Sequence, residues 1–271
     1  MARIIGSPSR YIQGKGTLAE ITKYTERLGK KLLILVSKSG KKRVEEKINK
    51  AVEGTDTTVV WEIFNGECSK SEVNRIGENL KKEKCDVVVG IGGGKILDTA
   101  KAVAYYEDIA VVCVPTAAST DAPCSALSVL YTDDGQFDEY LWLPANPDII
   151  LLDTDIIVAA PVRLIVSGMG DALATYFETR ACMRSNTTSC MGGSVSKTAM
   201  ALSELCFKTL MEDGAKALLA VNAGACTPAV ENIIEANTYL SGIGFESGGI
   251  AAAHAIHNGL TCIEETHGMY H

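Results

Sequence analysis

All four histidines of this 271-residue chain lie in its C-terminal segment, at His254, His257, His267 and His271. Imidazole is the commonest neutral protein ligand for a divalent zinc or iron ion. Histidines joined by one carboxylate leave a coordination position open for catalysis. The alternative is a polar helix and turn whose histidines only cap and hydrogen-bond. This segment alone is compatible with both interpretations, and the rest of the chain favours the metal site.

Residues 90–95, Gly-Ile-Gly-Gly-Gly-Lys, stand between an expected strand and an expected helix. Glycines there let the backbone approach a pyrophosphate, and a helix N-terminus offers N–H groups and partial positive charge. The spacing is not that of a G-x-G-x-x-G fingerprint, because Lys95 takes the place of the last glycine, nor that of a P-loop. A tight turn is the alternative. A hydroxyl-rich loop, residues 115–121, follows the next strand at the same edge of the sheet, and two such loops suit a dinucleotide.

Short apolar strands alternate with helices in the first part of the chain, which is typical of a doubly wound α/β sheet. Beyond Pro161 every periodic segment is helical. We therefore expect an α/β domain over 1–161 and a helical domain over 162–271. The expected strands are 31–36, 57–63, 86–91, 109–114 and 149–152, with a hairpin of 128–131 and 140–142, and the expected helices are 71–82, 95–106, 162–184, 193–213, 229–241 and 246–260. We expect residues 37–40 to be a loop that closes the first strand, followed by helical charge patterning through Lys50.

Composition excludes several classes of protein. The net charge of −7 argues against a nucleic-acid surface. No apolar stretch approaches the roughly 20 residues that span a bilayer, and the first residues lack the layout of a signal peptide. Nine cysteines without a C-x-x-C pair indicate neither a disulfide framework nor a thiolate zinc site, so we expect a cytoplasmic location.

Three longer motifs carry a resemblance to one enzyme family. They are Gly-Gly-Gly-Lys-x-x-Asp-Thr-Ala-Lys at 92–101, Pro-Thr-Ala-Ala-Ser-Thr-Asp-Ala-Pro-Cys-Ser-Ala-Leu-Ser-Val-Leu-Tyr at 115–131, and Gly-Met-Gly-Asp-Ala at 168–172. Together with the histidine segment, the chain resembles the glycerol dehydrogenase branch of the iron-containing (metal-dependent, group III) alcohol dehydrogenases over essentially its whole length. The resemblance implies an N-terminal Rossmann-like doubly wound domain followed by an all-helical, metal-binding domain, in a dehydroquinate synthase-like arrangement.

The resemblance also implies the site residues. Asp171, His254 and His271 would be catalytic metal ligands, and Asp121 would hydrogen-bond a polyol. Other branches place a fourth ligand, a histidine, four residues after the aspartate, where this chain has Thr175, so three ligands and Zn²⁺ fit better than four and iron. His257 and His267 are then capping residues or residues that orient the substrate. The implied nucleotide contacts are Gly93, Gly94, Lys95, Asp98, Thr116 and Ser119, with Ser125, Leu127 and Tyr131 at the nicotinamide end.

The implied activity is zinc-dependent hydride transfer from the secondary hydroxyl of glycerol, or of a related vicinal diol, to NAD, giving dihydroxyacetone. We expect a homo-oligomer in the full-length form. Two alternatives remain open. One is a relative that acts on a phosphorylated polyol, and the other is a catalytically inactive nucleotide-binding fragment.

Two features depart from the family pattern. Glycerol dehydrogenases usually carry an aspartate at position 37, which binds the adenosine ribose and repels a 2′-phosphate, whereas this chain has Ser37 followed by Lys38. We therefore expect NAD to be used and NADP to be tolerated. Family members also continue past the position of His271, so the sequence leads us to expect a truncated chain with an incomplete helical domain.

Overall fold

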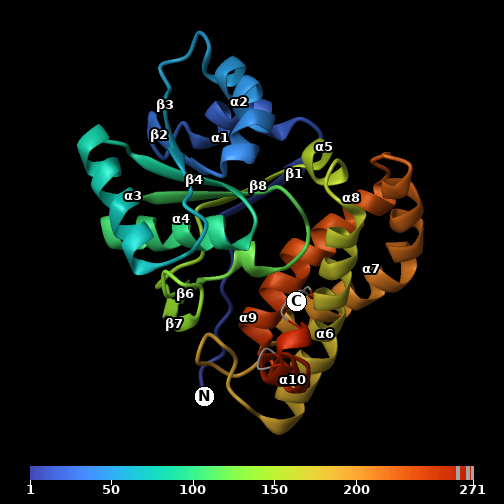
Figure 1. Ribbon diagram of the computed structural model, residues 1–271. Helices are drawn as coiled ribbons and strands as arrows, with labels where there is room; N and C mark the ends of the chain where they lie inside the picture. The colour runs from blue at the N-terminus through green and yellow to red at the C-terminus, as the bar shows by residue number, and fades with distance from the viewer. Residues whose placement is uncertain (261–262, 267–268, 270–271) are drawn as a thin grey trace. The chain divides into compact units, whose positions relative to one another are not determined.

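The computed structural model describes residues 1–260, 263–266 and 269, and it contains two compact units (Figure 1). The sheet unit comprises Pro8–Ala117 and Ala126–Ile157. The helical unit comprises Met1–Ser7, Ala118–Ser125 and Val158–His271. These ranges are not those of the expected 1–161 and 162–271 domains, because residues 1–7 and 118–125 group with the helices.

A six-stranded parallel sheet forms the sheet unit, in the order β1-β8-β5-β4-β2-β3. The chain runs outward from β2 to β3 and then returns to the other side of β2 to form β4. Strand order therefore reverses between β2 and β4, and ligands bind at such a point in open α/β sheets. The strands are β1 (Arg10–Gly14), β2 (Lys31–Val36), β3 (Thr58–Ile63), β4 (Val87–Gly92), β5 (Ala110–Pro115) and β8 (Ile149–Asp153).

Helices cover both faces of this sheet, which is why its central strands are uninterrupted apolar runs. Alternate residues such as Ile34, Val89 and Val112 pack with Leu18, Ile21, Val44 and Ile48 in one core cluster. In Figure 1, α1 and α2 lie on one side of the sheet, and α3 and α4 lie on the other. The remaining elements of the unit are η1 (Thr17–Glu20), α1 (Ile21–Thr25), α2 (Lys38–Val52), α3 (Lys70–Glu83), α4 (Gly94–Glu107), α5 (Thr154–Val158) and the antiparallel pair β6 (Leu127–Tyr131) and β7 (Phe137–Trp142).

The helical unit is built on two long helices, α6 (Val162–Ser185) and α7 (Lys197–Asn222), which pack against each other and against α9. None of the helices in the described part of the chain is long and apolar enough to cross a bilayer. The other elements are η2 (Ala122–Cys124), α8 (Pro228–Glu235), the π-helical segment η3 (Ala236–Leu240), α9 (Ser241–Gly248), α10 (Ala252–Leu260) and η4 (Glu264–Thr266).

The sequence prediction was wrong in three places. Strand β1 was not predicted, because Arg-Tyr-Ile-Gln-Gly shows no apolar run and lies at the edge of the sheet. Residues 37–40 were read as a loop, whereas Ser37 caps α2, which begins at Lys38. The single helix expected over 246–260 is two helices, because Gly249 has a φ of 90° and ends α9.

A buried ion pair joins α4 to the β6–β7 hairpin. Lys101, whose side chain is fully buried, lies 2.8 Å from the Asp98 carboxylate and also donates to Leu127 O. Asp98 in turn accepts from Val129 N at 3.2 Å. Because a buried charge is costly without its partner, this pair fixes the hairpin on the helix.

We predict that Lys101→Met destabilises the protein by about 3–5 kcal/mol, because it leaves the Asp98 carboxylate buried without its cation. Urea unfolding followed by circular dichroism measures the change. Lys81→Met is the matched control, since Lys81 is 67% exposed and pairs with Glu107 at the surface. Equal midpoints for the two variants would contradict a stabilising role for the buried pair.

Candidate functional site

The carboxyl ends of β2, β4 and β5 meet at one edge of the sheet, as the strand registers require. Val36 pairs with Ile91, and Gly92 pairs with Pro115. Ser37, Gly93 and Thr116 follow these strands directly, and Thr116 N donates to Gly92 O at 3.1 Å. The structure therefore brings together three of the residues that the sequence assigned to a nucleotide.

The four glycines around the junction of β4 and α4 divide into two kinds. A Cβ on Gly90 would lie 2.7 Å from the Ala100 Cβ, and one on Gly92 would lie 2.5 Å from the Ile96 Cδ1. These two glycines let α4 pack on the sheet. A Cβ on Gly93 or Gly94 would meet nothing within 4 Å in the described part of the chain. This open space at the N-terminus of a 14-residue helix is suited to a phosphate.

Ser37 lies at the N-terminus of α2, where its Oγ accepts from Gly40 N at 3.0 Å. Lys41 is turned towards β3, since its Nζ lies 3.3 Å from Glu45 and 5.2 Å from the Trp61 ring centroid. Lys38 is exposed. The helix thus offers N–H groups and an uncharged hydroxyl to a ribose, without the carboxylate of an aspartate.

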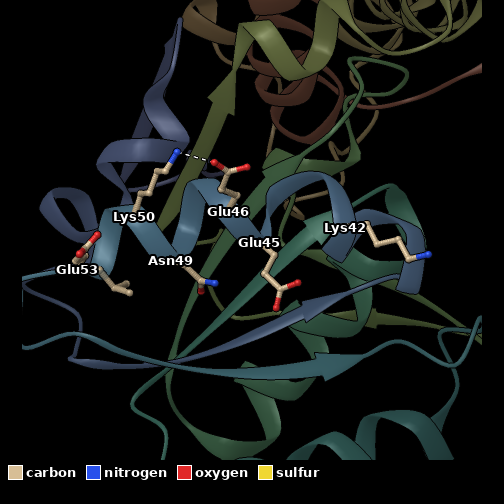
Figure 2. A pocket seen from close by; sticks show the side chains of 7 residues that line it. Lys42, Glu45, Glu46, Asn49, Lys50 and Glu53 are labelled. Carbon is tan, nitrogen blue, oxygen red and sulfur yellow. Dashed lines mark hydrogen bonds and ion pairs between the residues drawn. The ribbon is translucent and has the colours of Figure 1, made fainter.

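Lys42 lines a surface hollow of about 710 Å³ on α2 (Figure 2). The other residues of the hollow come from the same helix and its C-cap, Glu53, and carry mixed charges. Lys50 pairs with Glu46 at 2.6 Å. Such a pattern is typical of a solvated helix face rather than of a ligand site.

The remaining predicted nucleotide residues of the sheet unit surround the start of α4. Lys95 Nζ pairs with Glu67 at 2.6 Å and lies 5.1 Å from the centroid of the Tyr131 ring. Leu127 begins β6, and its carbonyl accepts from Lys101. Asp98 is buried and bonded within the protein, as described above, so its contacts in this structure are structural ones.

The other predicted residues, Ser119, Asp121 and Ser125, belong to the helical unit, where hydrogen bonds to α6 help to hold the loop that carries them. Asp121 N donates to Asp171 Oδ2 at 3.2 Å. Ser167 Oγ on α6 donates to Ser119 O at 3.4 Å. Ser125 is buried and donates to Ala122 O.

Asp171 and His254 approach each other as two ligands of one ion would. His254 Nε2 is 3.8 Å from Asp171 Oδ1. The other ring nitrogen, Nδ1, lies 2.5 Å from Glu178 Oε2, and Glu178 Oε1 accepts from the backbone N–H groups of Ala251 and His254. A carboxylate behind a histidine is the usual support of a metal-bound imidazole, because it fixes the ring and raises its basicity.

The carboxyl groups of Asp121, Asp171 and Glu178 lie close to His254 and influence its pKa. Burial raises the pKa of the Asp121 carboxyl well above its usual range, and the charge of Asp171 raises it further. Burial lowers the pKa of His254, but the hydrogen bond and charge of Glu178, with the charges of Asp121 and Asp171, outweigh burial and raise it overall. The cluster therefore favours a cation, which can be a proton or a metal ion.

This donor set fits a divalent metal ion, and the third expected ligand lies outside the described residues. Among residues 1–260, 263–266 and 269, no group of three or more His, Cys, Asp or Glu side chains is arranged to hold a metal. His271 and His267 are outside that part, and His257 is a half-buried residue of α10. Thr175, at the position of the fourth ligand of other branches, is fully buried and lies within hydrogen-bonding distance of Ser241.

Sequence reasoning missed Glu178 and Ser241, which contact His254 and Asp121 respectively. Neither belongs to a motif that was singled out. A signal for Glu178 does exist, because it lies seven residues after Asp171, two turns along the same helix face. No comparable signal marks Ser241.

The chain is similar to a known protein family and to several of its members. Residues 8–154 match the family described as iron-containing alcohol dehydrogenase. A glycerol dehydrogenase of Escherichia coli O6:H1 is 50% identical over 271 residues, which are 100% of this chain and 74% of that protein. One from Thermotoga maritima is 52% identical over 97% of this chain and 72% of its own length.

Similarity extends to solved structures. The crystal structure of glycerol dehydrogenase from Schizosaccharomyces pombe superposes with a TM-score of 0.92 at 41% identity, covering 97% of this chain and 67% of that one. The matched family profile, the identity to curated relatives and the shared fold lead to one conclusion: the chain belongs to the iron-containing alcohol dehydrogenase family.

Proposed function

We propose that this protein is an NAD-dependent glycerol (polyol) dehydrogenase that uses a bound Zn²⁺. The observation that carries the proposal is the approach of Asp171 Oδ1 to His254 Nε2, at 3.8 Å, beside the buried carboxylate of Asp121. The glycerol dehydrogenases named above support the substrate class. The proposed reaction removes hydride from the secondary hydroxyl carbon of glycerol and gives dihydroxyacetone.

Each part of the site has a task in this reaction. A bound Zn²⁺ would act as a Lewis acid that lowers the pKa of a substrate hydroxyl. Asp171 and His254 would hold it, with His271 as the third ligand, and Glu178 keeps the His254 ring oriented. Asp121 accepts a hydrogen bond from a neighbouring hydroxyl of the polyol and so fixes which carbon reacts.

The cofactor part of the proposal concerns the residues that bind NAD. We assign the pyrophosphate to the open backbone at Gly93 and Gly94, with Lys95 and Thr116 beside it, and the ribose to Ser37. Asp98 supports this surface through the ion pair that holds the hairpin. The other proposed contacts are Ser119 and Ser125 of the helical unit, with Leu127 and Tyr131 of β6.

A neutral polyol is a better substrate for this cluster than a phosphorylated one. Asp121 and Asp171 would repel a phosphate group placed beside them. The proposed oligomer is homomeric, and it is supported by apolar side chains exposed on α6, among them Val166, Leu173 and Phe177. A cytoplasmic location is proposed from the cysteine usage of the sequence, which has nine cysteines and no C-x-x-C pair.

Asp171→Ala should remove the metal and abolish polyol oxidation while NAD binding is retained. Metal content by mass spectrometry, expected at roughly one ion per chain, and NAD titration calorimetry measure the two properties, and the metal analysis also separates zinc from iron. Glu178→Gln serves as a comparison with a smaller expected effect. It keeps the ligands Asp171 and His254 and should weaken metal affinity only about 10- to 100-fold. Full metal content and activity in Asp171→Ala would end the metal assignment.

Gly94→Val should weaken NAD binding more than about tenfold, because the new side chain enters the space assigned to the pyrophosphate. Folding should be little affected, since a Cβ at Gly94 meets no atom of the described residues within 4 Å. Gly92→Val is the contrast, since its Cβ clashes with Ile96 and should destabilise the fold. Unchanged NAD affinity in a folded Gly94→Val protein would mean that the loop is only a turn.

Ser37→Asp should restore a strong preference for NAD over NADP. Aspartate also caps helices, so α2 keeps its N-cap, while the added charge repels a 2′-phosphate. Ser37→Asn is the matched control, because asparagine caps equally well without the charge. We expect selectivity, measured as the ratio of the two kcat/KM values, to rise about 10- to 100-fold in Ser37→Asp only. Equal selectivity in both variants, or rejection of NADP by the unsubstituted chain, contradicts this account of position 37.

A further inference from the structure

A series of three buried groups runs through the helical unit, from Thr175 on α6 through Ser241 at the start of α9 to Asp121. Thr175 Oγ1 and Ser241 Oγ are 2.7 Å apart, and Ser241 Oγ donates to Asp121 Oδ2 at 2.6 Å. A hydroxyl group can donate only one hydrogen bond, and Ser241 donates its bond to Asp121. Thr175 is therefore the donor in the hydrogen bond between the two hydroxyls. Both hydroxyl residues are fully buried.

The π-helical segment η3 directly precedes Ser241, and it also holds the loop that carries Asp121. Within it, Asn237 donates to Ala118 O and to Ile165 O, each at 3.0 Å. Gly168 on α6 lies so close to this loop that a Cβ there would be 2.1 Å from Ala118 O. These contacts fix the backbone of the loop but not the χ2 torsion of Asp121, which is intrinsically broad. The orientation of the Asp121 carboxylate therefore depends on the partners of its side chain.

We infer that Thr175 and Ser241 are positioning residues, which orient the Asp121 carboxylate so that its Oδ1 receives a hydroxyl of the polyol. Ser241 holds Oδ2 at 2.6 Å, so the substrate hydroxyl is assigned to the other oxygen, Oδ1. The substrate side of this inference rests on the proposed function, and the orientation of the carboxylate rests on the contacts alone.

The consequence is substrate preference. A site built to bond a substrate hydroxyl strongly rejects an analogue that lacks it. The Thr175–Ser241 pair therefore sets the preference of the enzyme for vicinal diols over simple alcohols, and it acts through Asp121 rather than by touching the substrate.

The test compares two buried threonines one turn apart on α6. Thr179 is also fully buried, and its Oγ1 donates to Gly244 O and accepts from Ser203 Oγ. Thr175→Val and Thr179→Val each remove one buried hydroxyl, but only the first lies behind Asp121. Thr175→Ser restores the hydroxyl.

The measured quantity is the ratio of kcat/KM for 1,2-propanediol to that for 2-propanol, which lacks one hydroxyl. We expect Thr175→Val to lower this ratio about tenfold, mainly by raising KM for the diol. Thr179→Val and Thr175→Ser should leave the ratio unchanged. Equal ratios in the two valine variants, whether both normal or both lowered, overturn the inference.

Crystal structures of the two valine variants give a second readout that does not depend on turnover. The Asp121 carboxylate should be rotated, or present in two orientations, in Thr175→Val and should keep its single orientation in Thr179→Val. If the unsubstituted chain oxidises no polyol, the proposed function fails, and these structures still decide the inference. An unrotated Asp121 in Thr175→Val refutes it.

Discussion

The carboxylates of Asp121 and Asp171 are buried next to each other, and most of the helical unit serves to make that arrangement possible. Buried charges are costly unless they are hydrogen-bonded or paired with a cation. Asp171 accepts from the backbone of Asp121, Ser241 donates to Asp121, and the ring of His254 lies beside Asp171 with Glu178 behind it. The segment 118–125 groups with the helices, and hydrogen bonds from Ser167, Asn237 and Ser241 join it to them.

The candidate site of the sheet unit favours an anion, whereas that of the helical unit favours a cation. Its candidate site consists of helix N-termini, open glycine backbone and a hydroxyl, at the edge where strand order reverses between β2 and β4. N–H groups and helix dipoles attract an anion, whereas the carboxylates of the helical unit attract a cation. A dinucleotide and a divalent metal ion are the two ligands that we propose for these two sites.

Much of the fold could be predicted, because a parallel sheet covered on both faces requires continuous apolar runs, and residues 31–36 and 149–152 are such runs. Edge strand β1 shows no such run. Glu178 and Ser241 escaped prediction because their contacts join residues 76 and 120 positions apart, which no local pattern encodes. Asp98 illustrates the reverse case. Its motif, which ends at Lys101, was recognised, whereas the buried ion pair with Lys101 and the hydrogen bond from Val129 N are seen only in the structure.

We propose that polyol oxidation depends on a metal ion held beside Asp121. The most direct measurement is glycerol-dependent formation of reduced NAD by the unsubstituted chain, before and after removal of metal with a chelator and then with zinc added back. The account predicts that activity disappears with the metal and returns with zinc, while NAD binding stays constant throughout. Activity that persists in the metal-free protein would contradict it.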